Sequence, residues 1–180
     1  PFLVMYFKDH YPEFFTATNL NWLPVLGNDH HKQILIEALQ NRVKRKQVII
    51  YAFVIMPNHF HIIWRLNNDV KKLDFQRDFM KFTARSILKF MQMNDDPLLQ
   101  KLAVKAADRN LQVWERNSLS IALFSDKVFM QKLDYMHNNP LQPKWRLVNY
   151  PEEYFYSSAK FYHKGSVTND FGLLTHYMAE

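Results

Sequence analysis

The chain has 180 residues, of which 48% are hydrophobic and 16% aromatic, and this composition excludes a disordered protein. It has no cysteine, which excludes disulfides and thiolate zinc sites and is compatible with a reducing cytoplasm. No apolar run reaches membrane-spanning length, and the net charge of +6 favours a polyanionic partner. We therefore expect a single domain over residues 1–180 that does not span a membrane, with no assignable motif after about residue 164.

The first half of the chain alternates between strand and helix patterns. Residues 14–20 alternate in polarity and predict a strand, and residues 29–46 predict an amphipathic helix with a basic end. Residues 47–55 are strongly β-forming, and a short turn connects them to a second strand that begins at residue 59. Residues 69–91 predict a long helix.

The second half is expected to add two helices and one strand. Residues 97–108 predict a shorter helix and residues 112–116 a strand. A last helix begins after Ser125, which can cap its start, and is stopped by Pro140. The resulting order β-α-β-β-α, followed by one more strand and helix, predicts an α+β fold. Its antiparallel sheet is of the split β-α-β type, with helices on one face.

Two histidines one residue apart mark the second strand of the hairpin. Side chains alternate along a strand, so His59 and His61 share one face, while Phe60, Ile62 and Trp64 take the other and can pack a core. Two imidazoles that converge in this way can serve as metal ligands. Taken alone, such a pair is more often only the polar face of a half-buried strand.

The last helix carries the residues that could complete a site. Tyr135 and Asn139 are neighbours at i, i+4 on one margin of the apolar stripe, so both can approach the histidines if this helix covers them. The alternative is a tyrosine that packs at the interface and an asparagine that caps the helix. His137 lies about 160° from Tyr135 around the axis, which predicts packing or capping. Lys132 is one turn before Tyr135 and either favours a phenolate there or is a solvated lysine.

Together these stretches resemble the HUH single-tyrosine transposases, and most closely the REP-associated tyrosine transposases. The resemblance lies in Met-Pro-Asn-His-Phe-His at 56–61 and Tyr-Met-His-Asn-Asn-Pro at 135–140, with further agreement at 112–116 and 151–159. It extends from about residue 10 to 163. Residues 118–123 depart from it, because the family often has an Asp-His pair there, and the segment after Pro140 lacks the usual glycine.

The resemblance implies a ferredoxin-like or RRM-like antiparallel sheet with the tyrosine helix packed across it. It implies that Tyr135 attacks single-stranded DNA to form a 5′-phosphotyrosine, and that His59, His61 and Asn139 hold Mg²⁺ or Mn²⁺. The DNA would carry a hairpin or palindromic repeat beside the cleaved strand. The protein would be a cytoplasmic, nucleoid-associated bacterial enzyme, monomeric or homodimeric.

Two groups of basic residues are candidates for DNA binding, although each could instead be an ordinary solvated helix face. They are Arg42, Lys44, Arg45 and Lys46 at the end of the first helix, and Arg77, Lys81, Arg85 and Lys89 at intervals of four on the long helix. Aromatic residues between 154 and 162 could stack bases, but core packing is favoured.

Two other classes of function remain open at this point. One is a metal-dependent hydrolase in which Tyr135 is structural, and the other is a catalytically silent DNA-binding module of the same fold.

Overall fold

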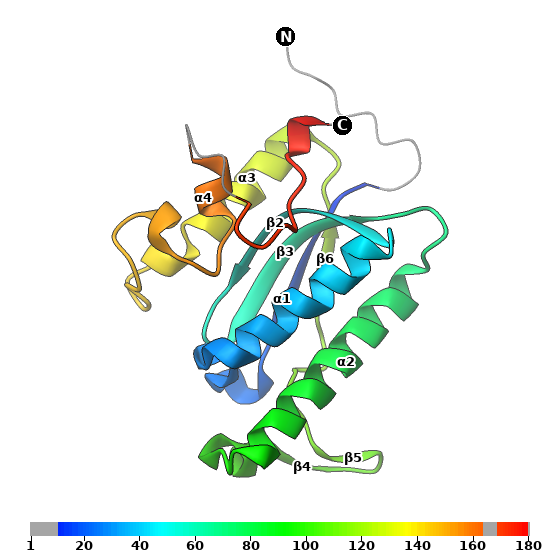
Figure 1. Ribbon diagram of the computed structural model, residues 1–180, viewed down its shortest axis with the longest axis vertical. Helices are drawn as coiled ribbons and strands as arrows, with labels where there is room; N and C mark the ends of the chain where they lie inside the picture. The colour runs from blue at the N-terminus through cyan, green and yellow to red at the C-terminus, as the bar shows by residue number, and fades with distance from the viewer. Residues whose placement is uncertain (1–10, 164–168, 180) are drawn as a thin grey trace.

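The computed structural model describes residues 11–163 and 169–179, and its centre is a four-stranded antiparallel sheet (Figure 1). The sheet has the order β2-β3-β1-β6, and its strands are β1 (Glu13–Thr18), β2 (Val48–Ile55), β3 (His59–Leu66) and β6 (Leu119–Ala122). With the two helices that connect them, these strands form a split β-α-β fold of ferredoxin-like order. The α+β architecture predicted from the sequence is confirmed.

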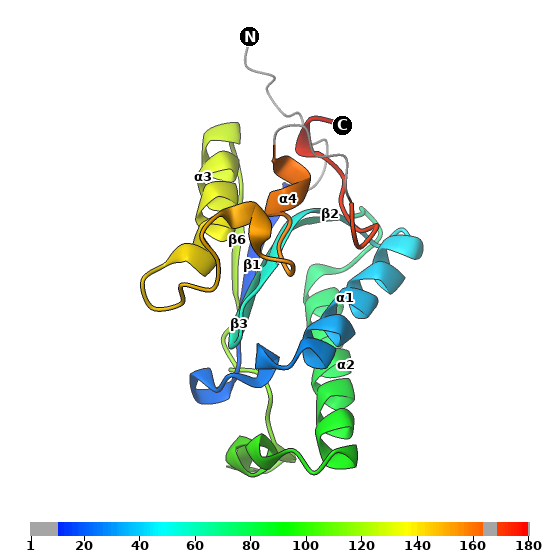
Figure 2. The same ribbon diagram turned by 60° about the vertical axis from the view of Figure 1, so that its left-hand side comes forward.

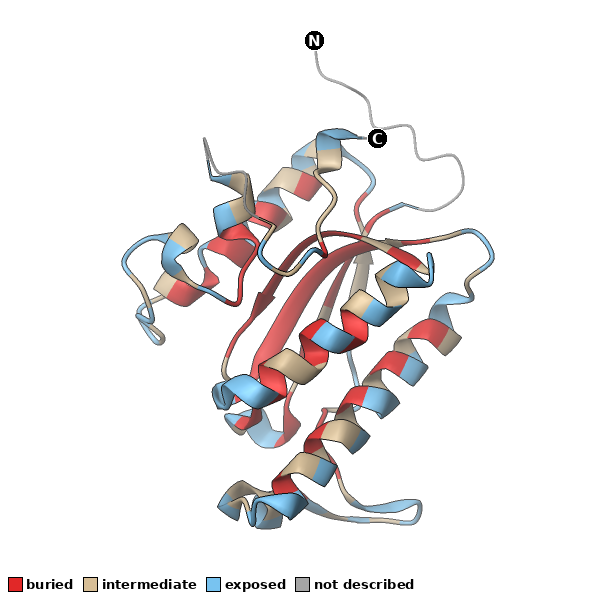
Figure 3. Cartoon of the chain, in the orientation of Figure 1, coloured by how far each residue is buried: buried red, intermediate tan, exposed pale blue. Residues whose placement is uncertain are grey.

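Helices cover both faces of this sheet, so the prediction from element order that they lie on one face is wrong (Figure 2). On one face lie α1 (Asp29–Lys44) and α2 (Lys72–Met93), whereas α3 (Asp126–His137) crosses the other. The alternation along β3 separates two cores, because Phe60, Ile62 and Trp64 pack beneath α1 and α2 while Ile63 packs with α3. Strands β2 and β3 are almost entirely buried between the helical layers, whereas β1 is partly buried and β6 is not buried (Figure 3).

The ends of α3 follow from local chemistry. The side chain of Ser125 accepts a hydrogen bond from the backbone N–H of Val128 and caps the first turn, as expected. The helix ends at His137, and a separate 3₁₀ turn, η4 (Asn139–Leu141), follows the cap residue Asn138. Asn139 therefore lies just beyond the regular helix rather than within it.

Two of the expected elements are wrong. Residues 97–108 do not form a helix: a 3₁₀ turn, η3 (Pro97–Leu102), leads into a small hairpin of β4 (Ala103–Ala106) and β5 (Arg109–Leu111). Residues 112–116 are not a sheet strand, and pair only through a bridge between Trp114 and Asn19. The fourth strand of the central sheet is instead β6, whose four residues are too few for a clear periodic pattern but pair with β1.

The region after α3 lies along the outer edge of β2. Ser157 bridges to Val54, and the N–H of Ser158 donates to the carbonyl of Phe53. His137 approaches Ser158 with its Nε2 2.9 Å from the hydroxyl oxygen, and the hydroxyl itself donates to the Phe53 carbonyl. His137 thus fixes the end of α3 to β2, in agreement with its predicted packing role.

Five short helical elements complete the described chain. They are η1 (Leu20–Trp22), η2 (Val25–Gly27), η5 (Pro151–Glu153), α4 (Ala159–Tyr162) and η6 (Tyr177–Ala179). Within residues 11–163 and 169–179, no helix combines the length and the apolar character needed to cross a membrane.

Candidate active site

The two histidines of β3 lie side by side on the sheet face that α3 crosses. Both side chains are buried, and their ring centroids are 4.9 Å apart at an angle of 72°. Because β3 is hydrogen-bonded to β1 on one side and to β2 on the other, its backbone holds both imidazoles in fixed positions. The structure thus places His59 and His61 on one face, as their spacing predicted.

Hydrogen bonds define which nitrogen of His59 carries the proton. Its Nδ1 lies 2.7 Å from the side-chain oxygen of Asn58. The orientation of that amide is set by its nitrogen, which donates to the carbonyl of Trp22 at 3.1 Å. Since the facing atom is a carbonyl oxygen, Nδ1 of His59 is the donor, and Nε2 keeps a free lone pair.

A hydrogen bond to Thr16 on β1 holds the ring of His61, which faces Asn139. Its Nδ1 is 2.7 Å from the hydroxyl oxygen of Thr16, and its Nε2 is 3.3 Å from the side-chain nitrogen of Asn139. An amide N–H directed at Nε2 requires a lone pair on that atom. Both histidines therefore present an unprotonated Nε2 to the space beside Asn139.

The amide oxygen of Asn139 supplies a test of whether a metal ion fits here. This oxygen is buried and has no hydrogen-bond partner among the described residues, although a buried acceptor without a partner is destabilising. Two imidazole nitrogens and one amide oxygen form a mixed donor set for a divalent cation, in which imidazole nitrogen suits transition metals and carbonyl-type oxygen suits Mg²⁺ or Mn²⁺. In the described part of the chain no three histidine, cysteine, aspartate or glutamate side chains are grouped to hold a metal. A site at these histidines therefore needs the asparagine.

Burial keeps both imidazoles neutral. Desolvation lowers the pKa of His59 to about 4, and the charge of Lys144 acts in the same direction. Desolvation also lowers the pKa of His61 to about 3, with further contributions from His59, Lys132 and Lys144. At neutral pH both side chains are therefore unprotonated, which is the state that binds a metal ion.

Tyr135 lies beside this cluster and is open to solvent. Its ring centroid is 5.4 Å from that of His61 and 6.2 Å from that of Phe14, and 45% of its surface is exposed. The ammonium of Lys132 lies 5.9 Å from the centre of the Tyr135 ring and 5.0 Å from that of Phe14. The structure therefore gathers the phenol, the lysine, the two imidazoles and the carboxamide on one face.

Other tyrosines differ from Tyr135. The hydroxyls of Tyr154 and Tyr162 donate to the carbonyls of Ile55 and Tyr51, and burial raises the pKa of both phenols. These two side chains anchor the C-terminal region to β2, which agrees with core packing rather than base stacking.

The basic residues at the end of α1 divide into two kinds. The guanidinium of Arg42 lies over the rings of Phe75, Phe79 and Phe82 on α2, and it donates to the carbonyl of Ala38. Burial lowers the pKa of this side chain. Arg42 thus joins α1 to α2, and the exposed members of the cluster are Lys44, Arg45 and Lys46.

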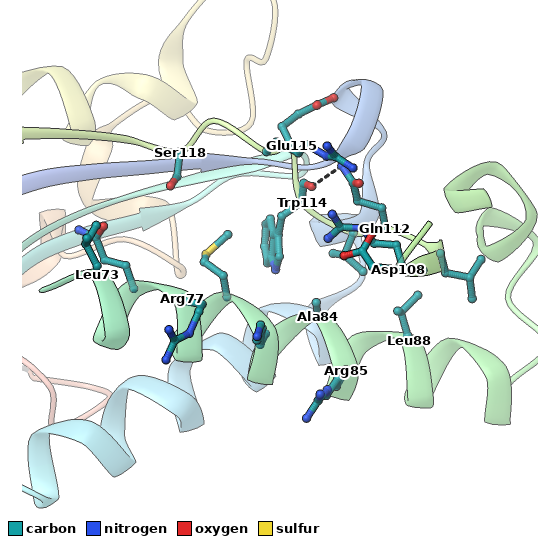
Figure 4. Close-up of a pocket in the computed structure, with 17 residues that line it drawn as sticks. Leu73, Arg77, Ala84, Arg85, Leu88, Asp108, Gln112, Trp114, Glu115 and Ser118 are labelled. Atoms are coloured by element: carbon teal, nitrogen blue, oxygen red, sulfur yellow. Dashed lines mark hydrogen bonds and ion pairs between the residues drawn. The ribbon is translucent and has the colours of Figure 1, made fainter. Parts of the chain in front are cut away.

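The basic residues of α2 lie on the opposite side of the sheet from Tyr135. Arg77, Lys81 and Arg85 are among the residues that line a groove of about 660 Å³ between α2 and segment 108–118 (Figure 4). Arg77 forms ion pairs with Asp74 and Asp78, and Lys89 is exposed further along the helix. In Figure 4 the side chains of Arg77 and Arg85 point away from Trp114. This ridge does not adjoin the candidate active site.

Several residues around the histidines were not identified from the sequence. Trp22 and Trp145 place their rings 6.1 and 6.0 Å from that of His59, and Asn58 and Thr16 orient the imidazoles. The proximity of Asn58 to His59 in the motif was the one local signal. The others come from distant segments and meet only in the folded chain.

The sheet order, the two helical layers and the histidine strand facing a tyrosine helix define an α+β protein of ferredoxin-like topology. The same fold occurs in a REP-associated tyrosine transposase solved with a bound REP hairpin. It matches with a TM-score of 0.61 at 19% identity over 95% of this chain and 94% of that chain. A candidate transposase from Deinococcus radiodurans R1 matches 74% of this chain and 95% of that chain, at 16% identity and a TM-score of 0.47. No protein-family model and no curated protein sequence matches the chain.

Proposed function

We propose that this protein is a metal-dependent endonuclease and strand transferase acting on single-stranded DNA, of the HUH single-tyrosine type. The observation that carries the proposal is the gathering of Tyr135, His59, His61 and Asn139 on one face of the sheet. The fold shared with a REP-associated tyrosine transposase supports the same class. That transposase is bound to a REP hairpin, which supports hairpin-containing DNA as the substrate here. The proposed place of action is the nucleoid in the cytoplasm of a bacterium.

The proposed reaction exchanges one phosphodiester for another. The Tyr135 oxygen attacks the phosphorus of one phosphodiester in the single strand. The bond from this phosphorus to the 3′ oxygen of the preceding nucleotide breaks. The phenol loses its proton and the departing 3′ oxygen gains one. The downstream strand stays joined to the protein through its 5′ phosphate, as a phosphotyrosine. A 3′-hydroxyl of another strand can then attack the same phosphorus and release Tyr135, so that joining needs no nucleotide cofactor.

The residues that would hold Mg²⁺ or Mn²⁺ are His59 and His61 through Nε2 and Asn139 through its amide oxygen. The Asn139 amide, whose nitrogen lies 3.3 Å from His61 Nε2, would rotate to present that oxygen. When bound, the ion supplies charge that neutralises the phosphate and stabilises the leaving oxygen. Mn²⁺ accepts imidazole more readily than Mg²⁺ and is the better probe. Asn58 and Thr16 keep the imidazoles in the tautomer that this binding requires.

Two lysines provide positive charge around the site. The ammonium of Lys132 lies 5.9 Å from the centre of the Tyr135 ring, so its positive charge adjoins the phenol that would attack the phosphate. Lys144 is close enough to both imidazoles to lower their pKa, and can contact a phosphate oxygen of the strand.

The exposure of Tyr135 argues against a hydrolase in which this residue is structural. The structural tyrosines Tyr154 and Tyr162 are partly buried and donate from their hydroxyls to backbone carbonyls, whereas Tyr135 is 45% exposed and lies beside the two imidazoles. A nucleophile needs that access to a strand arriving from solvent.

The decisive experiment is to trap the covalent intermediate. The protein is incubated with Mn²⁺ and single-stranded oligonucleotides covering the palindromes that flank its gene, and adducts are resolved on a denaturing gel. Wild type should form an adduct and Tyr135→Phe should not, while retaining its melting temperature and DNA affinity. Tyr150→Phe, a matched change at another exposed tyrosine, should react as wild type does. An adduct of equal yield in Tyr135→Phe would refute the assignment, and cleavage without any adduct would favour the hydrolase.

A further inference from the structure

An exposed tryptophan stands next to the candidate metal ligands. Trp22 is 59% exposed and belongs to neither buried core of the sheet. Among the described residues, its one aromatic contact is with His59, edge to face, at 6.1 Å between ring centroids. A large apolar ring that is exposed to water beside a polar site indicates a ligand-binding surface, because a ligand that covered the ring would remove apolar area from water.

The backbone holds Trp22 in a conformation that side chains of its size rarely adopt. Asn21 and Trp22 have φ values of 52° and 57°, both in the left-handed region. Such strain persists only where surrounding bonds hold it, and it concentrates at binding and catalytic sites. Here the N–H of Asn21 donates to the carboxylate of Glu115, and the N–H of Trp22 donates to the carbonyl of Asn19.

Asn58 connects this turn directly to the candidate metal site. Its amide nitrogen donates to the Trp22 carbonyl, its amide oxygen accepts from His59 Nδ1, and its backbone carbonyl accepts from the N–H of Asn19. One residue therefore fixes both the backbone of Trp22 and the orientation of the His59 ring. A nucleotide placed by Trp22 is in this way placed relative to the metal ligand.

A second turn, residues 144–146 in the segment after η4, also approaches His59. The ring of Trp145 lies 6.0 Å from that of His59, and the ammonium of Lys144 lies 5.5 Å from the centre of the Trp145 ring. Arg146, which follows, has a φ of 47° and is exposed. In Figure 2, η1 and the segment after η4 both lie on the α3 side of the sheet. Cations beside aromatic rings are typical of sites for single-stranded nucleic acid, where the cations contact phosphates and the rings stack on bases.

From this arrangement we propose that Trp22 is a stacking platform for an unpaired nucleobase of single-stranded DNA, next to the phosphate cleaved at the His59–His61–Asn139 site. Lys144 and Arg146 contact the flanking phosphates. A stacking platform accepts any base face, so Trp22 sets the position of the strand more than its sequence. This inference rests on the proposed function, because it names the part of the substrate that enters the same site.

The test measures binding without cleavage, in EDTA. Oligonucleotides that carry a hairpin and a single-stranded flank are labelled with 2-aminopurine at one flank position at a time. With wild type, the fluorescence of one position should be quenched by stacking. Trp22→Gly should abolish that quenching and weaken binding about 5- to 150-fold, the range for loss of one stacked base. Trp22→Phe, which keeps a ring, should recover most of the affinity.

The Trp22→Gly variant also distinguishes a role of the ring in base stacking from a role in the stability of the fold. Glycine adopts positive φ without strain, so Trp22→Gly should melt at the same temperature as wild type or higher. The control is Phe155→Ala, which removes a ring of matching exposure at 60% and should leave affinity and quenching unchanged. A blunt duplex without a flank should show no dependence on Trp22.

The proposal is overturned if Trp22→Gly binds the flanked hairpin as tightly as wild type, or if it loses affinity only in proportion to a lowered melting temperature. Equal loss of affinity for the blunt duplex also overturns it. These outcomes are distinct from failure of the proposed reaction, because an absent Tyr135 adduct with intact quenching by Trp22 would refute catalysis alone.

Discussion

Acid should unfold this protein through its buried histidines. Desolvation lowers the pKa of His59 and His137 to about 4 and that of His61 to about 3, against about 6.5 in an unfolded chain. Because the unfolded state binds more protons, the free energy of unfolding is highest above pH 6.5 and falls as the pH decreases below it. Burial also lowers the pKa of His31, which adds in the same direction.

The size of the effect follows from proton linkage. Between pH 7.5 and 5.5 each histidine stays neutral in the folded state while it becomes mostly protonated in the unfolded state, and this costs about 1.4 kcal/mol per residue. The three histidines together cost about 4 kcal/mol. In a chain of this length, such a change lowers the melting temperature by roughly 8–16 °C. Carboxylates contribute little in this range, because they titrate at lower pH.

Urea unfolding in EDTA at several pH values measures this dependence directly. His137→Gln removes one of the buried titrating histidines and should reduce the change by about 1.4 kcal/mol. Stability that is flat between pH 7.5 and 5.5, or an equal slope in His137→Gln, would refute this explanation.

Two further predictions concern metal and DNA. Mn²⁺ should raise the melting temperature of wild type, and Asn139→Ala should remove most of that rise, as seen by differential scanning fluorimetry; an unchanged rise would exclude the amide as a ligand. Changing both Lys81 and Arg85 to Gln should flatten the salt dependence of DNA binding by about one to two units, since single-stranded DNA contributes about 0.7 per neutralised phosphate. The same change at Lys144 and Arg146 is the comparison on the Tyr135 side of the sheet. If only that second pair alters the slope, the α2 ridge is an ordinary solvated face.

Local patterns predicted the parts of the fold that have long, regular sequences. The hairpin before and after residues 56–58 and the shared face of His59 and His61 follow from alternation with period two, which each strand contains within its own eight residues. The position of Tyr135 beside the histidines followed from helical spacing and from the resemblance at 135–140. Each of these inferences depended on the spacing of residues within a single strand or helix.

The errors occurred where tertiary contacts decide the structure. Residues 103–111 include three alanines, which favour helix, yet they form a hairpin. Residues 119–122 form a strand because β1 offers a free edge, and four residues contain too little pattern to show it. Trp22 and Trp145 lie 37 and 86 positions from His59, and no local periodicity relates them to it.

The phenol of Tyr135 and the carboxamide of Asn139 are only four positions apart, at the end of α3 and in the turn that continues it, whereas both imidazoles belong to β3. Any movement of α3 over the sheet would therefore shift the proposed nucleophile and the proposed third ligand together. A shift of this one helix would halt both the attack and the rejoining step of the proposed reaction.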